Sequence, residues 1–180
     1  DADALPRGLL ATLTPKDLAD PQTTLALIGF DAVVGVRGTV EQDSNGKLTL
    51  TRVGITCALC HSTVDDSFAP GIGRRLDGWA NTDLDVGKIV ALTPSEALSE
   101  ETKEQFRYWG PGMYDPRHHA FDGVGLITLH NESLPVVIPP IYGLKGVGFE
   151  TVTADGPISY WNSYVGVGQM GGHGTFIDPR

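Results

Sequence analysis

Five consecutive residues, Cys57 to His61 ("CALCH"), constrain the fold more than any other segment of the chain. They contain its only two cysteines, and a histidine follows the second cysteine directly. Side chains three positions apart lie on the same face of a helical turn, so two thiols and an imidazole must be presented together. The rest of the chain has to accommodate whatever these three side chains bind.

Three kinds of site use such residues. Cys-x-x-Cys-His attaches haem of the c type: the thiols bond to its two vinyl groups and the histidine binds the iron. A redox dithiol needs no histidine and usually lies in a βαβ context, which this sequence lacks. A zinc site needs two further ligands, but there is no other cysteine and His118 and His119 lack zinc-finger spacing. We therefore favour one covalent haem c at Cys57, Cys60 and His61, with Cys57 and Cys60 as thioethers.

Covalent haem attachment predicts a location outside the cytoplasm. Bacteria attach this haem after export, so we expect a periplasmic or other extracytoplasmic protein whose leader is already removed. No basic-then-apolar leader is present, and no stretch approaches the roughly 18 apolar residues of a membrane span. The chain starts abruptly at "DADALPRGLL" and stops at "GTFIDPR", so we expect it to be cut from a longer product.

The charge balance bears on partners. The net charge of −9 argues against nucleic acid and anionic membranes, which both need a basic surface. It favours a redox protein partner with a basic docking face. The 23 glycines and 12 prolines exceed the roughly 12% expected for the two together, so we expect long ordered loops.

Local signals predict mostly short elements. Pro15 and Pro21 punctuate an N-terminal helical region, and Asn45-Gly46 lies between two alternating runs, which is typical of a hairpin. Thr93, Pro94 and Glu96 predict a helix start that Gly110-Pro111 ends. The expected helices are 6–13, 15–29, the motif itself, a brief one in 85–92, about 93–110 and 157–167. The expected strands are 32–41, 47–55 and 125–129. Residues 66–83 and most of 111–140 are expected to be loop.

The motif and its surroundings resemble class I c-type cytochromes. In that family a proline after the motif supplies the carbonyl that accepts a hydrogen bond from the histidine ligand, and "APGIGRR" offers Pro70 for this role. Farther on, "IPPIYGLKGVG" is similar to a run in proteins related to the di-haem cytochrome c peroxidases. Those relatives carry a second Cys-x-x-Cys-His that this chain lacks. The resemblance therefore implies either a second haem domain outside this chain or a stand-alone mono-haem cytochrome.

The resemblance implies a mainly α, cytochrome c-like haem domain with long loops and a small N-terminal β-hairpin. We expect residues 1–55 to form an N-terminal extension of helices and hairpin. Residues 56–180 form the c-type haem domain, and the two together make one compact unit.

The second axial ligand decides what such a haem does. A thioether ligand raises the reduction potential, as in His/Met cytochromes. Met170, in the glycine-flanked "GQMGGHG", is favoured because glycine allows backbone to approach a flat ligand closely. Met113, His130, His173 or an open position remain alternatives.

Polar and aromatic residues after the motif are candidates for the rim of the haem. Arg74 and Arg75 could pair with the haem propionates, which need charge-assisted donors. The alternative is a solvated loop. Trp79 could donate its indole N–H to a propionate, or serve as a core residue.

The expected function is that of a periplasmic electron-transfer cytochrome with one His/Met-ligated haem. No grouping of His, Glu and Arg resembles a peroxide-cleaving site. The alternative is the haem domain of a peroxidase-like or oxygenase-like enzyme with one open side of the iron, and a haem subunit with an assembly role is a third possibility.

Overall fold

The computed structural model describes residues 1–94, 96, 98–115, 135–143 and 145–148. The chain divides into two compact units, each described by itself below. The first unit comprises Asp1–Asn81 and Ile138–Tyr142, and the second comprises Thr82–Val137 and Gly143–Arg180.

Proline and capping residues define the N-terminal helices of the first unit. Thr14 and Asp17 form a reciprocal capping box, with Pro15 at the first helical position. Asp20 caps the next helix, which starts at Pro21. The predicted helix over 15–29 is thus two helices. The elements are η1 (Ala2–Ala4), α1 (Leu9–Thr12), α2 (Pro15–Leu18) and α3 (Pro21–Gly29).

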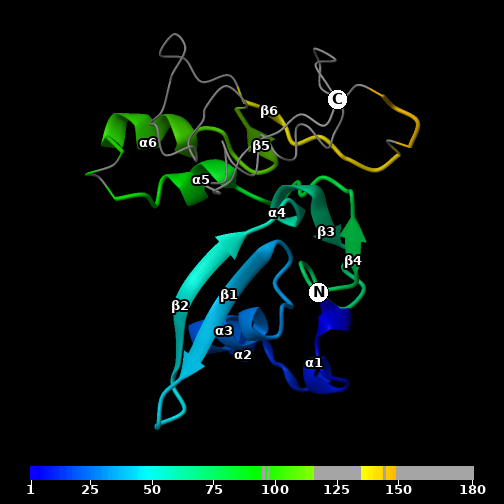
Figure 1. Ribbon diagram of the computed structural model, residues 1–180, viewed down its shortest axis with the longest axis vertical. Coiled ribbons are helices and arrows are strands. Elements are labelled where there is room, and N and C mark those ends of the chain that lie inside the picture. Colours follow the sequence, from blue (N-terminus) through cyan, green and yellow to red (C-terminus); the bar gives the residue numbers. More distant parts are fainter. Residues whose placement is uncertain (95, 97, 116–134, 144, 149–180) are drawn as a thin grey trace. The chain divides into compact units, whose positions relative to one another are not determined.

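The hairpin predicted around Asn45-Gly46 is present. Strands β1 (Val36–Gln42) and β2 (Leu48–Ile55) pair antiparallel (Figure 1). Helix α3 packs on this hairpin, and its Ile28 is only 7% exposed. A Cβ on Gly38 would lie 2.6 Å from the Ile28 side chain, so the absence of a side chain in β1 allows the close packing of α3.

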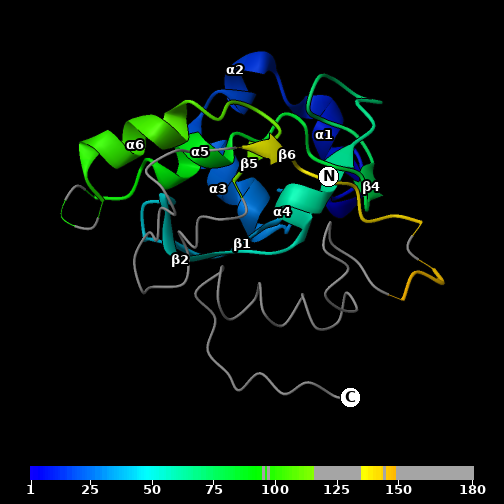
Figure 2. The ribbon, with the colours of Figure 1, turned by 90° about the horizontal axis from the view of Figure 1, so that it is seen from above.

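The Cys-x-x-Cys-His motif follows β2 directly. Helix α4 (Ala58–His61) is the short helix expected there, at the end of β2 (Figure 1, Figure 2), and it leads into β3 (Ser62–Val64), as Figure 1 shows. Strand β3 pairs with β4 (Arg75–Asp77), so the loop predicted over 66–83 is partly a strand. The pairing is stabilised by a Ser62–Asp77 side-chain hydrogen bond of 2.7 Å, a long-range contact that periodicity does not reveal.

The predicted boundary after residue 55 does not separate the hairpin from the motif. The Thr56 amide donates to the Gly35 carbonyl at 2.9 Å, and Gly35 is buried against the backbone of Leu59. The attachment motif and the hairpin therefore belong to the same compact unit.

The second unit is built around aromatic packing. Phe106 is fully buried, and its ring meets that of Trp109 edge-on at 4.9 Å between centroids. A Ser99 cap starts α6, so this helix begins later than the predicted Thr93 start. The elements are α5 (Val86–Val90), α6 (Glu100–Arg107), β5 (Met113–Tyr114) and β6 (Val136–Val137). The strand predicted at 125–129 and the helix at 157–167 lie outside the described residues.

None of the helices among the described residues combines the length and the apolar character that a membrane crossing requires.

Candidate haem attachment site

The two cysteines of the motif lie on the single turn of α4 and form no disulfide with each other. Cys57 occupies the N-cap position and is exposed, whereas Cys60 is half-buried. His61 is the last residue of the helix and is also half-buried. The motif is therefore folded as one helical turn that offers two thiols and an imidazole.

A short segment, residues 78–81, binds the carbonyl groups of α4; we call it the clasp. The Gly78 amide donates to the His61 carbonyl at 2.8 Å, and the Asn81 amide donates to the Cys60 carbonyl at 2.9 Å. The side-chain amide of Asn81 donates to the Leu59 carbonyl, also at 2.9 Å. Three successive carbonyls of the motif thus have partners in a segment almost twenty residues farther along the chain.

One nitrogen of the His61 ring is already engaged. Nδ1 lies 2.9 Å from the carbonyl oxygen of Pro139. A carbonyl oxygen only accepts hydrogen bonds, so Nδ1 must carry the proton and donate it. In a neutral ring this leaves Nε2 with a free lone pair, which is the form that binds a metal, and such a partner also fixes the orientation of a histidine ligand. Burial lowers the pKa of His61, which favours the neutral ring, although the Pro139 hydrogen bond opposes this shift.

The carbonyl partner of His61 differs from the expectation. Pro70 was predicted to supply this carbonyl, but it lies in an exposed turn between Ala69 and Ile72, which bridge each other. Pro139 belongs instead to the "IPP" run, for which no role beside His61 was predicted. Only the long-range return of residues 138–142 into the first unit brings it to His61.

Two aromatic side chains stand exposed on the segments that hold His61. Trp79 lies in the clasp and Tyr142 follows Pro139, and their rings are 5.2 Å apart between centroids. Trp79 is 51% exposed and Tyr142 54% exposed. Aromatic rings that remain this open are available to pack on a flat apolar ligand.

Cys60 is the more buried of the two thiols. Burial, with a smaller contribution from Cys57, raises the pKa of the Cys60 thiol to about 11. Cys60 is therefore a protonated thiol at neutral pH, which is compatible with a dithiol as well as with haem attachment.

The grouping of metal-binding side chains bears on the zinc interpretation. Among the described residues, no three His, Cys, Asp or Glu side chains are grouped so that they could hold one metal ion, and Cys57, Cys60 and His61 are all described. Zinc needs four ligands around one point. In c-type attachment the thiols and the imidazole instead address different atoms of the cofactor, so convergence on one ion is not required.

The predicted propionate partners lie close in sequence to the clasp but have other contacts. Arg75, in β4, pairs with Asp77 through Nε at 2.5 Å. The backbone amide of Arg74 donates to the Asp65 carboxylate at 2.8 Å, and the side chain of Arg74 is exposed. Both arginines remain candidates for the haem rim, with Arg74 the less engaged of the two.

The axial-ligand candidates are described only in part. Met113 is half-buried in β5 of the second unit. Met170, His130 and His173 lie outside the described residues, as do His118 and His119.

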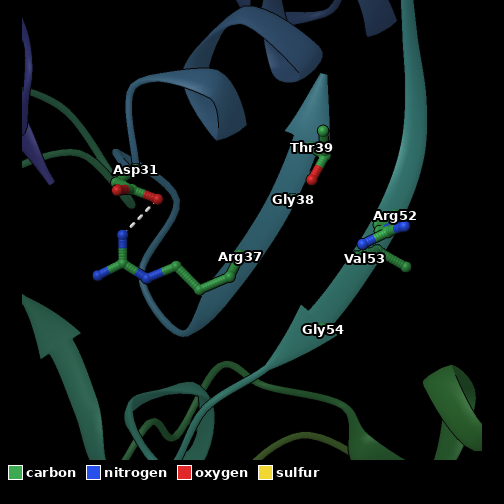
Figure 3. A pocket seen from close by; sticks show the side chains of 7 residues that line it. All are labelled: Asp31, Arg37, Gly38, Thr39, Arg52, Val53 and Gly54. Atoms are coloured by element: carbon green, nitrogen blue, oxygen red, sulfur yellow. Dashed lines mark ion pairs between the residues drawn. The ribbon is translucent and has the colours of Figure 1, made fainter. Parts of the chain in front are cut away.

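A hollow of about 380 Å³ opens on the β1–β2 hairpin (Figure 3). In it the Arg37 guanidinium reaches across to Asp31 and pairs with it, while Arg52 comes from the neighbouring strand. Its lining residues are Asp31, Arg37, Gly38, Thr39, Arg52, Val53 and Gly54. The lining contains neither thiol nor imidazole of the motif.

Sequence reasoning missed several residues that shape the site. Gly78, Asn81, Pro139 and Tyr142 were not assigned roles around His61, although the "IPP" run was noted. Gly78, Asn81 and Pro139 bind α4 from up to 78 positions away in the sequence. No local sequence pattern predicts these contacts.

Comparison of the chain with protein-family models, curated proteins and solved structures gave no match.

Proposed function

We propose that this protein is a mono-haem c-type cytochrome that carries electrons in the periplasm or another extracytoplasmic space. The observation that supports this most strongly is the contact between His61 Nδ1 and the Pro139 carbonyl. It fixes the ring and leaves Nε2 as the ligand nitrogen, directly after two cysteines on one helical turn.

Each residue of the site has a distinct task in this proposal. Cys57 and Cys60 hold the cofactor through thioether bonds, and His61 binds the iron through Nε2. Trp79 and Tyr142 provide apolar rings that exclude water from the cofactor. A haem held in this way supplies one-electron redox chemistry.

The proposal also covers the side of the haem opposite His61 and the redox partner. Met170 closes the other side of the iron, which a stable electron carrier requires, and one residue of Arg74, Arg75 and Trp79 meets a propionate. The net charge of −9 favours a redox partner with a basic docking face. A second haem domain on the same gene product would fit the resemblance to di-haem peroxidases.

The first test is the intact mass of protein produced in a bacterial periplasm with its haem-attachment system. We expect wild type to exceed the polypeptide mass by one haem under denaturing conditions. Cys57→Ala or Cys60→Ala should leave at most one thioether, and the double variant should leave none. Ser67→Ala, in an exposed loop of the same unit, serves as the control and should match wild type. Wild-type protein without added mass would contradict the proposal.

The second test separates a carrier from an enzyme. A low-spin ferric spectrum that does not change with cyanide or peroxide on the mixing timescale is expected of a carrier with two strong axial ligands. High-spin ferric iron that binds either ligand rapidly would instead favour the peroxidase-like or oxygenase-like alternative.

A further inference from the structure

We propose that Asn81 and Gly78 are positioning residues of the haem site, which hold the attachment motif in its ligand-binding shape before any haem is present. This inference rests on the proposed haem function. It adds two residues that act on the motif through hydrogen bonds and not on the cofactor itself. It also assigns the clasp, residues 78–81, a role in the orientation of His61.

The need for such residues follows from the length of α4. A helix of four residues cannot stabilise itself, because nucleation of the first turn is unfavourable. Its terminal carbonyls also have no partner within the helix. In this protein the carbonyls of Leu59, Cys60 and His61 all accept hydrogen bonds from the clasp.

Asn81 is suited to this task because it uses two donors at once. Its backbone amide binds the Cys60 carbonyl, and its side-chain amide binds the Leu59 carbonyl, each at 2.9 Å. Asn81 is half-buried, so these bonds are partly shielded from water. The residue thereby fixes the peptide groups on both sides of the second thiol.

Gly78 connects the backbone of His61 with its side chain. Its amide donates to the His61 carbonyl at 2.8 Å, and its own carbonyl accepts from the Ile141 amide, also at 2.8 Å. The loop segment that contains Ile141 also carries the Pro139 carbonyl that meets His61 Nδ1. The hydrogen bonds therefore form a closed ring, which restricts both the position of His61 and the rotation of its imidazole.

The conformation of Gly78 explains why this position requires glycine. Its φ of +83° lies in the left-handed region. A Cβ at this position would also lie 2.9 Å from the Cβ of Tyr142. A side chain here would push the 138–142 segment away and displace the Pro139 carbonyl from His61.

The decisive variant is Asn81→Asp, which keeps the shape of the side chain but replaces the donor with a carboxylate facing the Leu59 carbonyl. Asn45→Asp makes the same chemical change in the exposed hairpin turn and is the matched control. If Asn81→Asp fails to fold, Asn81→Ala, which removes the donor without adding charge, takes its place.

The first measurement uses full-length protein without haem, obtained with Cys57→Ala and Cys60→Ala. Amide hydrogen exchange should show the Gly78 and Asn81 amides protected, and Asn81→Asp should reduce their protection at least about tenfold. Asn45→Asp should leave it unchanged. Equal protection in the Asn81 variant and the control would overturn the proposal.

The second measurement uses the haem-loaded protein. Because ligand orientation affects the iron, Asn81→Asp should change the low-spin paramagnetic resonance signal and the reduction potential, while Asn45→Asp should not. Unchanged signal and potential in Asn81→Asp would overturn the positioning role even if stability fell. Wild type without haem would defeat the proposed function instead, and the exchange data would still report whether the clasp holds α4.

Discussion

A single carbonyl oxygen determines which nitrogen of His61 is free to bind a metal. Because the Pro139 oxygen can only accept, it selects the tautomer with the proton on Nδ1 and leaves the lone pair on Nε2. The motif letters predict a histidine ligand, but they do not say which nitrogen is used or what holds the ring. Those properties come from a residue 78 positions away.

Gly35 shows how closely the motif is packed on the hairpin. A Cβ there would lie 2.2 Å from both the Cα and the amide nitrogen of Leu59, and its φ is +79°. Gly35→Ala should therefore lower the free energy of unfolding by at least about 2 kcal/mol, from left-handed strain and overpacking together. It should also reduce the yield of haem-loaded protein. Urea unfolding and the haem content per polypeptide are the measurements.

The control for Gly35 lies on the same hairpin. Gly54 has open space around the position of a Cβ and is exposed. Gly54→Ala should change the free energy of unfolding by less than about 0.5 kcal/mol. If both alanine variants behaved alike, the close contact between Gly35 and Leu59 would not govern the stability of the motif.

At the scale of elements, the sequence predicted the structures that depend on neighbouring residues, such as turns and helix starts. It did not predict the pairing of segments that are far apart in the chain. The Asn45-Gly46 turn, the helix start at Pro15 and the short helix of the motif were predicted from a few neighbouring residues, but the separate start of α3 at Pro21 was not. Strand β4 was missed because three residues are too few to show a strand pattern and because it pairs only with β3. The contact between residues 138–142 and the motif cannot be predicted from any short sequence pattern.

The start of α6 illustrates a competition between two local signals. Thr93, Pro94 and Glu96 match a capping pattern, but the helix begins after Ser99, whose side chain accepts from the Thr102 amide. Glu100 and Glu101 then place negative charge in the first turn, where the helix dipole favours it. Both Thr93 and Ser99 are adequate caps, so the local sequence does not decide between the two helix starts. Packing decides, because it buries Leu98 and Phe106 in the second unit.

The β3–β4 pair should contribute an acid-sensitive part of the stability. Hydrogen bonds from Ser62 and then Arg75 lower the pKa of Asp77. A carboxyl with a depressed folded-state pKa stabilises the fold above its ordinary pKa of about 3.9, and this contribution is lost as pH falls through the folded-state value. Because Asp77 is 70% exposed, solvent screening limits the contribution to less than about 1 kcal/mol.

Asp77→Asn tests this contribution. The variant should be less stable than wild type at pH 7, and the difference should shrink as pH falls from about 5 towards 3. Urea unfolding at a series of pH values measures it. Asp83→Asn removes a carboxylate that makes no hydrogen bond or ion pair with any residue the structure describes, and it should show no such trend. A pH-independent difference for Asp77→Asn would mean that its carboxylate is not the acid-sensitive group.

At the scale of the whole molecule, the haem proposal assigns tasks to different parts of the chain. The first unit supplies the thiols, the proximal imidazole and the aromatic pair of Trp79 and Tyr142. These residues account for the attachment and for one axial position only. In a carrier a second axial ligand from elsewhere in the chain closes the iron, whereas in an enzyme that position stays open.

The two methionines give a direct test of that assignment, since the sequence contains no others. A thioether ligand produces a sulfur-to-iron charge-transfer band and a raised reduction potential. Met170→Ala should abolish the band and lower the potential, whereas Met113→Ala should leave both unchanged and serves as the matched control. Loss of the band in Met113→Ala would transfer the role to β5. A wild-type protein without the band, with histidine-like low-spin signals that disappear in His173→Ala or His130→Ala, would replace the thioether with a second imidazole and lower the expected potential.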